Sequence, residues 1–354
     1  KTVQLMGEIK KAVHFEHTGN PPDVVNLVNL KSEQVGPGDA LIDVEAAAIN
    51  PSHLLTLQGS YGVQPDLPAV PGAEGIGKIV GVGKDVVNVK AGDRVVLHWR
   101  PSTGIQSPTP KYMWGRKTVN AGWVTTFNEQ AIVSENRLTV IPDDLDMKIA
   151  PLFGCAVTTA FGVVNNDAQI KLGQSVVVFG IGGVGLNIVQ AASLVSATPI
   201  VGVDLVAHKL EMGKKFGLSH GFIGGGDGLN VKICNVVGSQ GADVVIETTG
   251  DSRVIEQAYN MTHPEGKTIL VGVPKKGDNI SIPSLPLHFD KVLTGSHGGD
   301  AEPDKDIPRI IRLMNAGRLN FDGLITHEFS LDNINEAIRI FRSGEAGRIV
   351  LNMA

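Results

Sequence analysis

A glycine-rich turn between a predicted strand and a predicted helix constrains the fold of this chain more than any other feature. The turn is Gly180-Ile-Gly-Gly-Val-Gly185, and it follows the short apolar run Ser175–Phe179. The spacing of apolar residues over 186–192 indicates a helix directly after it. Asp204 ends a second apolar run, nineteen residues after the last glycine. Glycines at this spacing, with an acidic residue about twenty positions on, predict a dinucleotide-binding site.

The glycines of this turn meet separate steric demands. Gly180 permits the tight turn, Gly182 lets a pyrophosphate approach the main chain, and Gly185 lets the helix pack closely on the strand. Gly183 and Val184 stand at the start of the helix, where free N–H groups face the phosphates. The alternative is an ordinary glycine-rich turn, and the acidic residue at this distance argues against it.

Asp204 also bears on the choice of nucleotide. Its carboxylate can accept hydrogen bonds from both hydroxyls of the adenosine ribose, and it would repel a 2′-phosphate. Leu205 and Val206 follow it, so no adjacent arginine is available to hold that phosphate. The sequence therefore predicts that NAD(H) is preferred over NADP(H). Capping of the strand end is the alternative role of Asp204.

Length and composition narrow the class of protein. The 354 residues are enough for two domains, and 42% hydrophobic with 19% charged residues is typical of a globular protein. A net charge of −5 without a basic block argues against nucleic acid or a membrane as the main partner, and no apolar run is long enough to span a bilayer. Cys155 and Cys234 are the only cysteines, so a reducing compartment is expected. That compartment is the cytoplasm, or the mitochondrial matrix if the chain is the mature end of a processed precursor.

Strand and helix signals change along the chain. The first part has short apolar strands separated by Gly, Pro and Asp, which predicts a partly open β-barrel. Within it, residues 99–120 form a long, Pro-containing surface excursion. Strands then alternate with helices, which predicts a doubly wound parallel sheet. A last strand, Arg348–Asn352, is expected to return to the first domain. The predicted fold class is α/β, with a catalytic domain at 1–155, completed by 301–354, and a dinucleotide-binding domain at 156–300.

Five short motifs accompany the glycine turn: Gly36-Pro-Gly-Asp39, Asn50-Pro-Ser-His53, Pro71-Gly-Ala-Glu-Gly-Ile-Gly77, Lys90-Ala-Gly-Asp-Arg-Val95 and Gly154-Cys-Ala-Val-Thr-Thr159. With the order of domains, they resemble the medium-chain dehydrogenase/reductase superfamily over nearly the whole chain. The resemblance implies a GroES-like barrel domain followed by a Rossmann domain. It also implies a homodimer or higher homo-oligomer that acts on a small-molecule substrate.

The two halves of the chain resemble different branches of this superfamily. In the first half, Ile49-Asn-Pro-Ser52, Leu57–Gly62 and Leu67–Gly72 are similar to enoyl thioester and quinone reductases. In the second half, Gly154-Cys155 and Gly347-Arg348 are similar to zinc alcohol dehydrogenases. A recombined chain would explain this mixture, and so would an unfamiliar natural branch.

The resemblance raises the question of a catalytic zinc ion. Zinc alcohol dehydrogenases place a Cys, a His and a second Cys on the metal, and Asn50, Ala73 and Cys155 stand at those positions here. A catalytic zinc takes three good donors from the protein, whereas this set offers one thiol. An unusual set of His53, Glu74 and Cys155 is the alternative. We therefore expect an enzyme without zinc and without metal-ligating residues.

Without a metal to polarise a carbonyl group, reduction of an activated C=C bond asks less of the protein. The cofactor transfers a hydride to the β-carbon, and an acid on the protein supplies the proton that completes the reduction. Tyr61 lies in the Gln-Gly-x-Tyr stretch where the resembled enoyl reductases carry their catalytic tyrosine. A phenol can donate that proton. A tyrosine packed at the edge of a loop is the alternative.

Four more site residues follow from the resemblance. Asn50 orients the substrate or is a turn amide, and Thr159 contacts the nicotinamide or caps a helix. Lys209 helps to bind the ribose or lies on a solvated helix face. Arg348 binds the pyrophosphate, for which a guanidinium is suited, or is an exposed residue before a strand.

Three side chains are expected in the substrate pocket: His53, Trp123 and Phe127. His53 replaces the acid that usually follows Asn-Pro-Ser in these families, and a role as proton relay is left open. The two aromatic residues line the pocket or belong to an aromatic core.

The leading functional prediction is a zinc-independent, NADH-preferring reductase of enoyl thioesters, enones or quinones. The second is an NAD-dependent alcohol or aldehyde dehydrogenase, which the second half of the chain and the predicted NAD preference favour. The third is a cofactor-binding structural or sensor protein without turnover. Substrate, direction of reaction and oligomeric state are not readable from the sequence.

Overall fold

The computed structural model describes residues 10–353, which divide into two compact units. The first unit holds the described chain up to Cys155, together with Glu302–Ile311 and the segment from Phe321 on. The second holds Ala156–Ala301 and Arg312–Asn320. Among the described residues, no helix is both long and apolar enough to cross a membrane.

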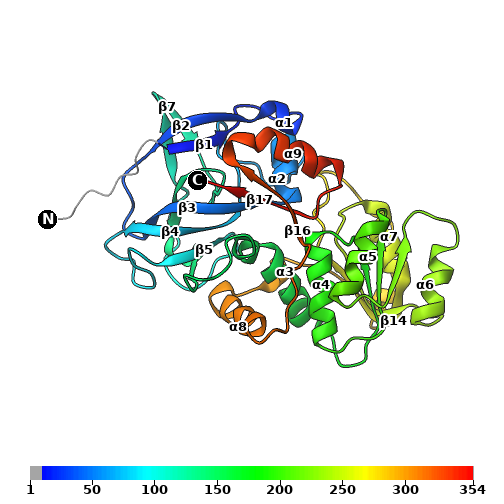
Figure 1. Cartoon of the computed structure of the whole chain (residues 1–354). Coiled ribbons are helices and arrows are strands. Elements are labelled where there is room, and N and C mark those ends of the chain that lie inside the picture. The colour runs from blue at the N-terminus through cyan, green and yellow to red at the C-terminus, as the bar shows by residue number, and fades with distance from the viewer. Residues whose placement is uncertain (1–9, 354) are drawn as a thin grey trace. The chain divides into compact units, whose positions relative to one another are not determined.

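A seven-stranded sheet forms the centre of the first unit (Figure 1). Its apolar side chains are buried in one cluster that runs through all the long strands. The last strand pairs antiparallel with β3, with Ile349 opposite Ile49, so the end of the chain lies in the sheet of the first unit. The strands in order are β16 (Ile325–Ser330), β17 (Arg348–Asn352), β3 (Asp39–Ile49), β4 (Glu74–Val82), β5 (Arg94–His98) and β9 (Leu138–Val140), and β8 (Gln130–Ser134) also pairs with β3.

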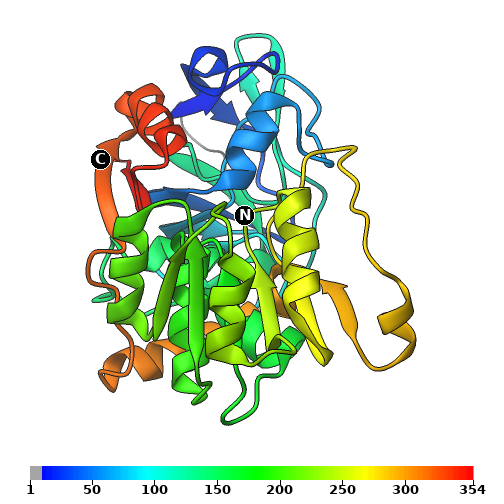
Figure 2. The ribbon, with the colours of Figure 1, turned by 90° about the vertical axis from the view of Figure 1, so that its right-hand side faces the viewer.

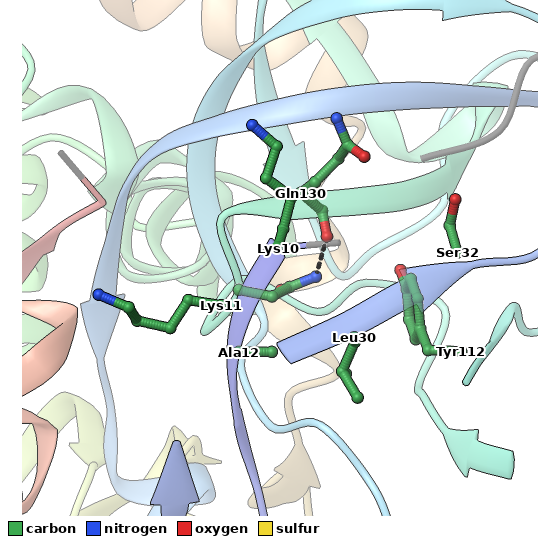
Figure 3. A pocket seen from close by; sticks show the side chains of 8 residues that line it. Lys10, Lys11, Ala12, Leu30, Ser32, Tyr112 and Gln130 are labelled. Carbon is green, nitrogen blue, oxygen red and sulfur yellow. Dashed lines mark hydrogen bonds between the residues drawn. The ribbon is translucent and has the colours of Figure 1, made fainter. Parts of the chain in front are cut away.

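A second, four-stranded sheet contains part of the segment predicted as a surface excursion. The end of that segment is a hairpin, and the buried Tyr112 anchors it because its hydroxyl accepts a hydrogen bond from the main-chain N–H of Ile132. A cavity of about 10 Å³ lies beside Tyr112, Leu30 and Ser32 (Figure 3). It is large enough for one water molecule at most, so it is no substrate site. The strands in order are β1 (Lys10–His14), β2 (Asn26–Ser32), β6 (Lys111–Trp114) and β7 (Lys117–Asn120).

Short helices complete this part of the chain. The most important for the site is α2 (Pro51–Gln58), which follows β3 directly and ends at Gly59, in the left-handed region with φ 75°. The other helices are α1 (Pro21–Val24), α8 (Pro303–Asn315), which is divided between the two units, and α9 (Ile334–Ser343).

Six parallel strands form the sheet of the second unit, which faces the viewer in Figure 2. The central strand is buried along its whole length, as is typical of parallel sheets covered on both faces. The strands in order are β12 (His220–Ile223), β11 (Ile200–Asp204), β10 (Val176–Phe179), β13 (Ala242–Glu247), β14 (Thr262–Leu270) and β15 (Val292–Gly295). The helices are α3 (Ala156–Gly162), α4 (Gly183–Leu194), α5 (Ala207–Phe216), α6 (Leu229–Val237) and α7 (Ser252–Met261).

The strand order of this sheet reverses between β10 and β13. The chain runs outward from β10 through β11 to β12, then returns to β13 on the other side of β10 and runs outward again. In such sheets the ligand crevice lies at the carboxyl ends of the strands where the order reverses. The glycine turn follows β10, so it lies at that position. This confirms the predicted α/β fold with a doubly wound parallel sheet.

His98 fixes the end of the strand that pairs with β4. Its Nδ1 lies 2.8 Å from the carbonyl oxygen of Arg100, and its Nε2 lies 2.9 Å from Oγ1 of Thr139. The ring is completely buried. Burial lowers the pKa of His98, the hydrogen bond to the carbonyl oxygen of Arg100 opposes this, and the charge of Arg137 adds to it. Together they bring the pKa from the ordinary 6.5 to about 4.

We therefore expect acid to weaken the fold through His98. The folded-state pKa is depressed, so the neutral ring stabilises the fold above pH 6.5, and this stability is lost as pH falls from 6.5 towards 4. The test is urea unfolding of the wild type and of a His98→Gln variant between about pH 4 and 7.5. Between pH 4 and 6.5, the unfolding free energy of the variant should rise with pH less steeply than that of the wild type, by about 1.4 kcal/mol per pH unit. An unchanged slope would contradict this account.

Candidate functional site

The glycine turn of the second unit has the steric form that its sequence predicts. Gly180 has φ 90°, in the left-handed region, and its N–H donates to the carbonyl oxygen of Val203 at 2.8 Å. A Cβ at position 185 would lie 1.9 Å from the carbonyl oxygen of Gly180, so only glycine fits there. A Cβ at position 182 would meet nothing within 4 Å. Gly185 is therefore required by packing, whereas Gly182 faces open space.

The first turn of α4 is open to an anion. No side chain caps this twelve-residue helix at Gly182, and Gly183 and Val184 are only partly buried. Main-chain N–H groups at an uncapped helix start need an external acceptor. Together with the open space at Gly182, this geometry fits the pyrophosphate of a dinucleotide.

Asp204 stands at the end of β11, beside the turn. Its Oδ2 accepts a hydrogen bond from the N–H of Ile181 at 2.8 Å, and its Oδ1 accepts one from the N–H of Val206 at 2.9 Å. Each carboxylate oxygen has further lone pairs, so Asp204 can also accept from a ribose. The structure thus brings Asp204 and the glycine turn together through a direct hydrogen bond.

Two other cofactor residues lie on helices of the same unit. Lys209 is half-buried in the first turn of α5, directly after Asp204. Thr159 is buried on α3, which packs against α4. Their roles toward the nucleotide stay predictions.

In the first unit, Asn50 begins α2 with a reciprocal cap. Its side-chain oxygen accepts a hydrogen bond from the N–H of Ser52 at 3.1 Å, while Nδ1 of His53 accepts one from the N–H of Asn50 at 3.2 Å. Its side-chain Nδ2 donates to Oε1 of Glu74 at 3.1 Å. Asn50 is therefore a capping residue and also part of a buried polar cluster.

Glu74 and Arg348 form an ion pair at the centre of that cluster. Their side chains are 0% and 2% exposed, and Nη2 of Arg348 donates to Oε1 of Glu74. The Nε of Arg348 is buried without an acceptor among the described residues. Arg348 therefore is not the exposed residue that we considered as an alternative. Removing one partner of a buried pair costs about 3–5 kcal/mol, because the other charge is left unpaired.

The protonation state of His53 follows from its cap. Because Nδ1 accepts a hydrogen bond, the neutral ring carries its proton on Nε2. Burial, and then the charge of Arg348, lower the pKa of His53 to about 3. His53 is therefore neutral near pH 7, and its ring packs edge-on against Phe127 with 4.8 Å between the ring centroids. Its place in the cap makes it a positioning residue for Asn50.

Tyr61 lies in the turn after α2, where its main-chain N–H donates to the carbonyl oxygen of Leu55 at 3.1 Å. The side chain is half-buried. Burial, and then the charge of Cys155, raise the pKa of the phenol above its ordinary 10. Tyr61 therefore keeps its proton at neutral pH and can donate it.

Trp123 and Phe127 occupy different environments. Trp123 is 53% exposed, and the guanidinium carbon of Arg137 lies 4.6 Å from the centre of its ring. Phe127 is buried in the core of the first unit. Contact of either side chain with a substrate stays a prediction.

The three positions that we compared with zinc ligands hold Asn50, Ala73 and Cys155. Gly154 packs tightly against Glu74, since a Cβ there would lie 2.9 Å from the Cα of Glu74, and this close approach brings Cys155 toward the cluster. Within residues 10–353, no group of three or more His, Cys, Asp or Glu has a geometry that could hold a metal ion. The three compared positions themselves offer one thiol to a metal ion.

Two residues of the second unit were missed by sequence reasoning. Glu247 ends β13, and Thr248 follows it and contacts the glycine turn. The available signal was their position at the carboxyl end of a strand next to β10. Position at a strand end singled out the glycine turn and Asp204, but not the end of β13.

Comparisons with known proteins match both units. Residues 36–143 match the family described as alcohol dehydrogenase GroES-like domain, and residues 183–316 match the family described as zinc-binding dehydrogenase. The chain is 31% identical to a putative alcohol dehydrogenase D from Mycobacterium tuberculosis, over 96% of this chain and 98% of that protein. It is 30% identical to an S-(hydroxymethyl)glutathione dehydrogenase from Paracoccus denitrificans, over 97% of this chain and 99% of that protein. Its structure is similar to benzyl alcohol dehydrogenase from Acinetobacter calcoaceticus, with a TM-score of 0.87, 25% identity, and coverage of 98% of this chain and 100% of that one.

These comparisons correct our cofactor prediction. We expected NAD(H) without zinc, and the match to zinc-binding dehydrogenases over 183–316 contradicts that expectation. Our inference considered donors at three sequence positions and one alternative set, and such a count cannot exclude a metal that other donors hold. The relatives are also named alcohol dehydrogenases, which favours our second functional reading over reduction of C=C bonds.

Proposed function

Because the chain belongs to the medium-chain dehydrogenase/reductase superfamily, we propose that it is an NAD-dependent alcohol or aldehyde dehydrogenase. The observation that carries the proposal is the open glycine turn at the reversal of strand order, next to Asp204. Whole-length similarity to proteins named alcohol dehydrogenases supplies the substrate class.

NAD would be held by the second unit through its main chain. The N–H groups at the start of α4 would bind the pyrophosphate, and Asp204 would accept hydrogen bonds from the ribose. When bound, the nicotinamide supplies or accepts the hydride. Lys209 and Thr159 are proposed as further contacts.

The first unit would supply the groups that handle the substrate oxygen. Tyr61 retains its phenolic proton at neutral pH and would donate it to the carbonyl oxygen when an aldehyde is reduced. In alcohol oxidation the step runs in reverse, so the hydroxyl proton would pass to the phenolate form of Tyr61, which the raised pKa makes scarce at neutral pH. Asn50, held by His53 and Glu74, would orient the substrate.

A substrate panel tests the proposed function. A primary alcohol, an aromatic alcohol and their aldehydes should be compared with a crotonyl thioester and an ortho-quinone, with NAD(H) and NADP(H), and with zinc added or chelated. We expect oxidation of an alcohol or reduction of an aldehyde with the NAD couple. Turnover of the thioester or quinone without any alcohol or aldehyde turnover would contradict the proposal. Tight NADH binding without turnover of any compound would favour a non-catalytic role.

Substitution of Tyr61 tests its role as proton donor. A Tyr61→Phe variant should reduce aldehyde at least about tenfold more slowly at saturating NADH, which is the scale of a general-acid contribution. The matched control is Tyr112→Phe, which removes a buried hydroxyl from the same unit. It should lower stability by about 1 kcal/mol and leave turnover near that of the wild type. Equal turnover of Tyr61→Phe and the wild type would remove Tyr61 from the mechanism.

The edge of the parallel sheet is the surface that a second copy would cover. β15 is the last strand in the order, so its outer edge is unpaired within the described chain. Exposed apolar side chains gather on this strand and the segment before it, and among them Leu285 and Phe289 are 67% and 66% exposed. An exposed edge strand with apolar neighbours is suited to pairing with another chain. We propose that a homodimer forms there, continuing the sheet from one copy into the next.

The mass of the protein in solution tests this interface. Light scattering should give twice the chain mass of 37.4 kDa for the wild type, and Phe289→Asp should shift the protein toward the monomer because a charge would be buried in the interface. Leu172→Asp is the control, since Leu172 is 82% exposed before β10 on the same unit. A Phe289→Asp protein that stays dimeric would place the interface elsewhere.

A further inference from the structure

Thr248 connects the two strands that flank the reversal of strand order. Its N–H donates to the carbonyl oxygen of Phe179 at 2.9 Å. Its hydroxyl lies 2.9 Å from the carbonyl oxygens of both Phe179 and Gly180, where it acts as donor. The side chain that follows β13 is therefore bonded to the glycine turn that follows β10.

Glu247 holds Thr248 in this position. Its carboxylate is completely buried, and Oε1 accepts hydrogen bonds from the N–H of Gly250 at 2.9 Å and from the N–H and hydroxyl of Thr249. The loop is also tightly packed, because a Cβ at Gly272 would lie 2.2 Å from the nitrogen of Gly250. Thr248 is thus presented by a loop with little freedom to move.

The peptide group between Gly180 and Ile181 is bonded at both ends. Its carbonyl oxygen accepts from the hydroxyl of Thr248, and its N–H donates to Oδ2 of Asp204 at 2.8 Å. A peptide group is planar, so rotation at one end moves the other. The orientation of this one plane therefore links Thr248 on β13 to the carboxylate that ends β11.

We propose that Thr248 is a positioning residue for the dinucleotide, acting through this peptide plane on Asp204 and on the helix start at Gly182. The proposal rests on the proposed function, because it assumes that the turn binds a nicotinamide dinucleotide. Thr248 would act on the adenosine half of the cofactor, which the turn and Asp204 contact. Loss of its hydroxyl should therefore weaken cofactor binding and leave the rate of the bound complex unchanged.

Three variants of the full chain test the proposal. Thr248→Val keeps the shape of the side chain and removes the hydroxyl, whereas Thr248→Ser keeps the hydroxyl. Thr262→Val is the matched control, because Thr262 is a buried threonine on β14 whose hydroxyl donates to the carbonyl oxygen of Ala258, without contact to the turn. The dissociation constants of NADH and of ADP-ribose, the part of the cofactor without nicotinamide, should be measured with thermal stability and kcat.

We expect Thr248→Val to bind both ligands roughly three- to tenfold more weakly, the scale of one lost hydrogen bond. Its kcat at saturating cofactor should stay within about twofold of the wild type, because the lost interaction is made equally before and during the reaction. Thr248→Ser should restore binding. Thr262→Val should lower thermal stability and leave both dissociation constants unchanged.

Other outcomes would overturn the proposal. Thr248→Val that binds NADH like the wild type would show that the hydroxyl does not position the turn. Equal weakening in Thr248→Val and Thr262→Val would assign the effect to general loss of stability, and failure of Thr248→Ser to restore binding would assign it to shape.

Failure of the proposed function itself has a separate signature. Gly182→Ala serves as the reference, since its methyl group has space in the fold but would stand where the pyrophosphate approaches. Binding of NADH by the wild type, with weakening in Gly182→Ala, supports the cofactor site whatever Thr248 does. A wild-type protein that binds neither NADH nor ADP-ribose would overturn the function and this inference together.

Discussion

The approach of Gly185 to the carbonyl oxygen of Gly180 is the constraint on which the cofactor half of the structure depends. With 1.9 Å between that oxygen and the position of a Cβ, α4 can begin against β10 only if residue 185 has no side chain. The same carbonyl group belongs to the peptide plane that Thr248 and Asp204 hold. Backbone packing thus fixes the direction of the helix start, and two side chains from the neighbouring strands fix the peptide that leads into it.

In the first unit, the interaction on which the site depends is a buried ion pair. Glu74 on β4 and Arg348 on β17 lie on opposite sides of β3 in the sheet order. Their attraction joins the last strand to the first domain in addition to the main-chain ladder. Asn50 then connects Glu74 to the start of α2, and His53 closes the cap. The position of the helix that precedes Tyr61 therefore depends on residues from three distant parts of the chain.

Features that depend on local sequence were predictable, and features that depend on distant pairing were not. The glycine turn and the strand Arg348–Asn352 follow from residue spacing within a few positions, and both are found as predicted. The hairpin at the end of 99–120 was missed, because β6 is fixed by pairing with β2, about eighty residues earlier. Nothing local to Arg348 indicates that Glu74, 274 residues away, is its partner. The contact between Thr248 and Gly180 could not be predicted either, because it depends on β13 lying next to β10 in the sheet.

Our prediction of an enzyme without zinc was corrected for a similar reason, because metal binding depends on residues that are distant in the sequence. Residues 183–316 match a family described as zinc-binding dehydrogenase, whereas the assignment of metal ligands depends on which side chains converge in the fold. Glu74 directly follows Ala73 in the sequence, and its carboxylate is already bonded to Arg348 and Asn50. A metal ion bound by Glu74 would have to compete with Arg348, at a cost on the scale of a broken buried pair, about 3–5 kcal/mol. Dinucleotide recognition by the main chain asks only for glycines at fixed spacing, so it can be read from sequence. A metal centre needs side chains that meet in space, so its ligands follow from the folded arrangement and not from sequence spacing.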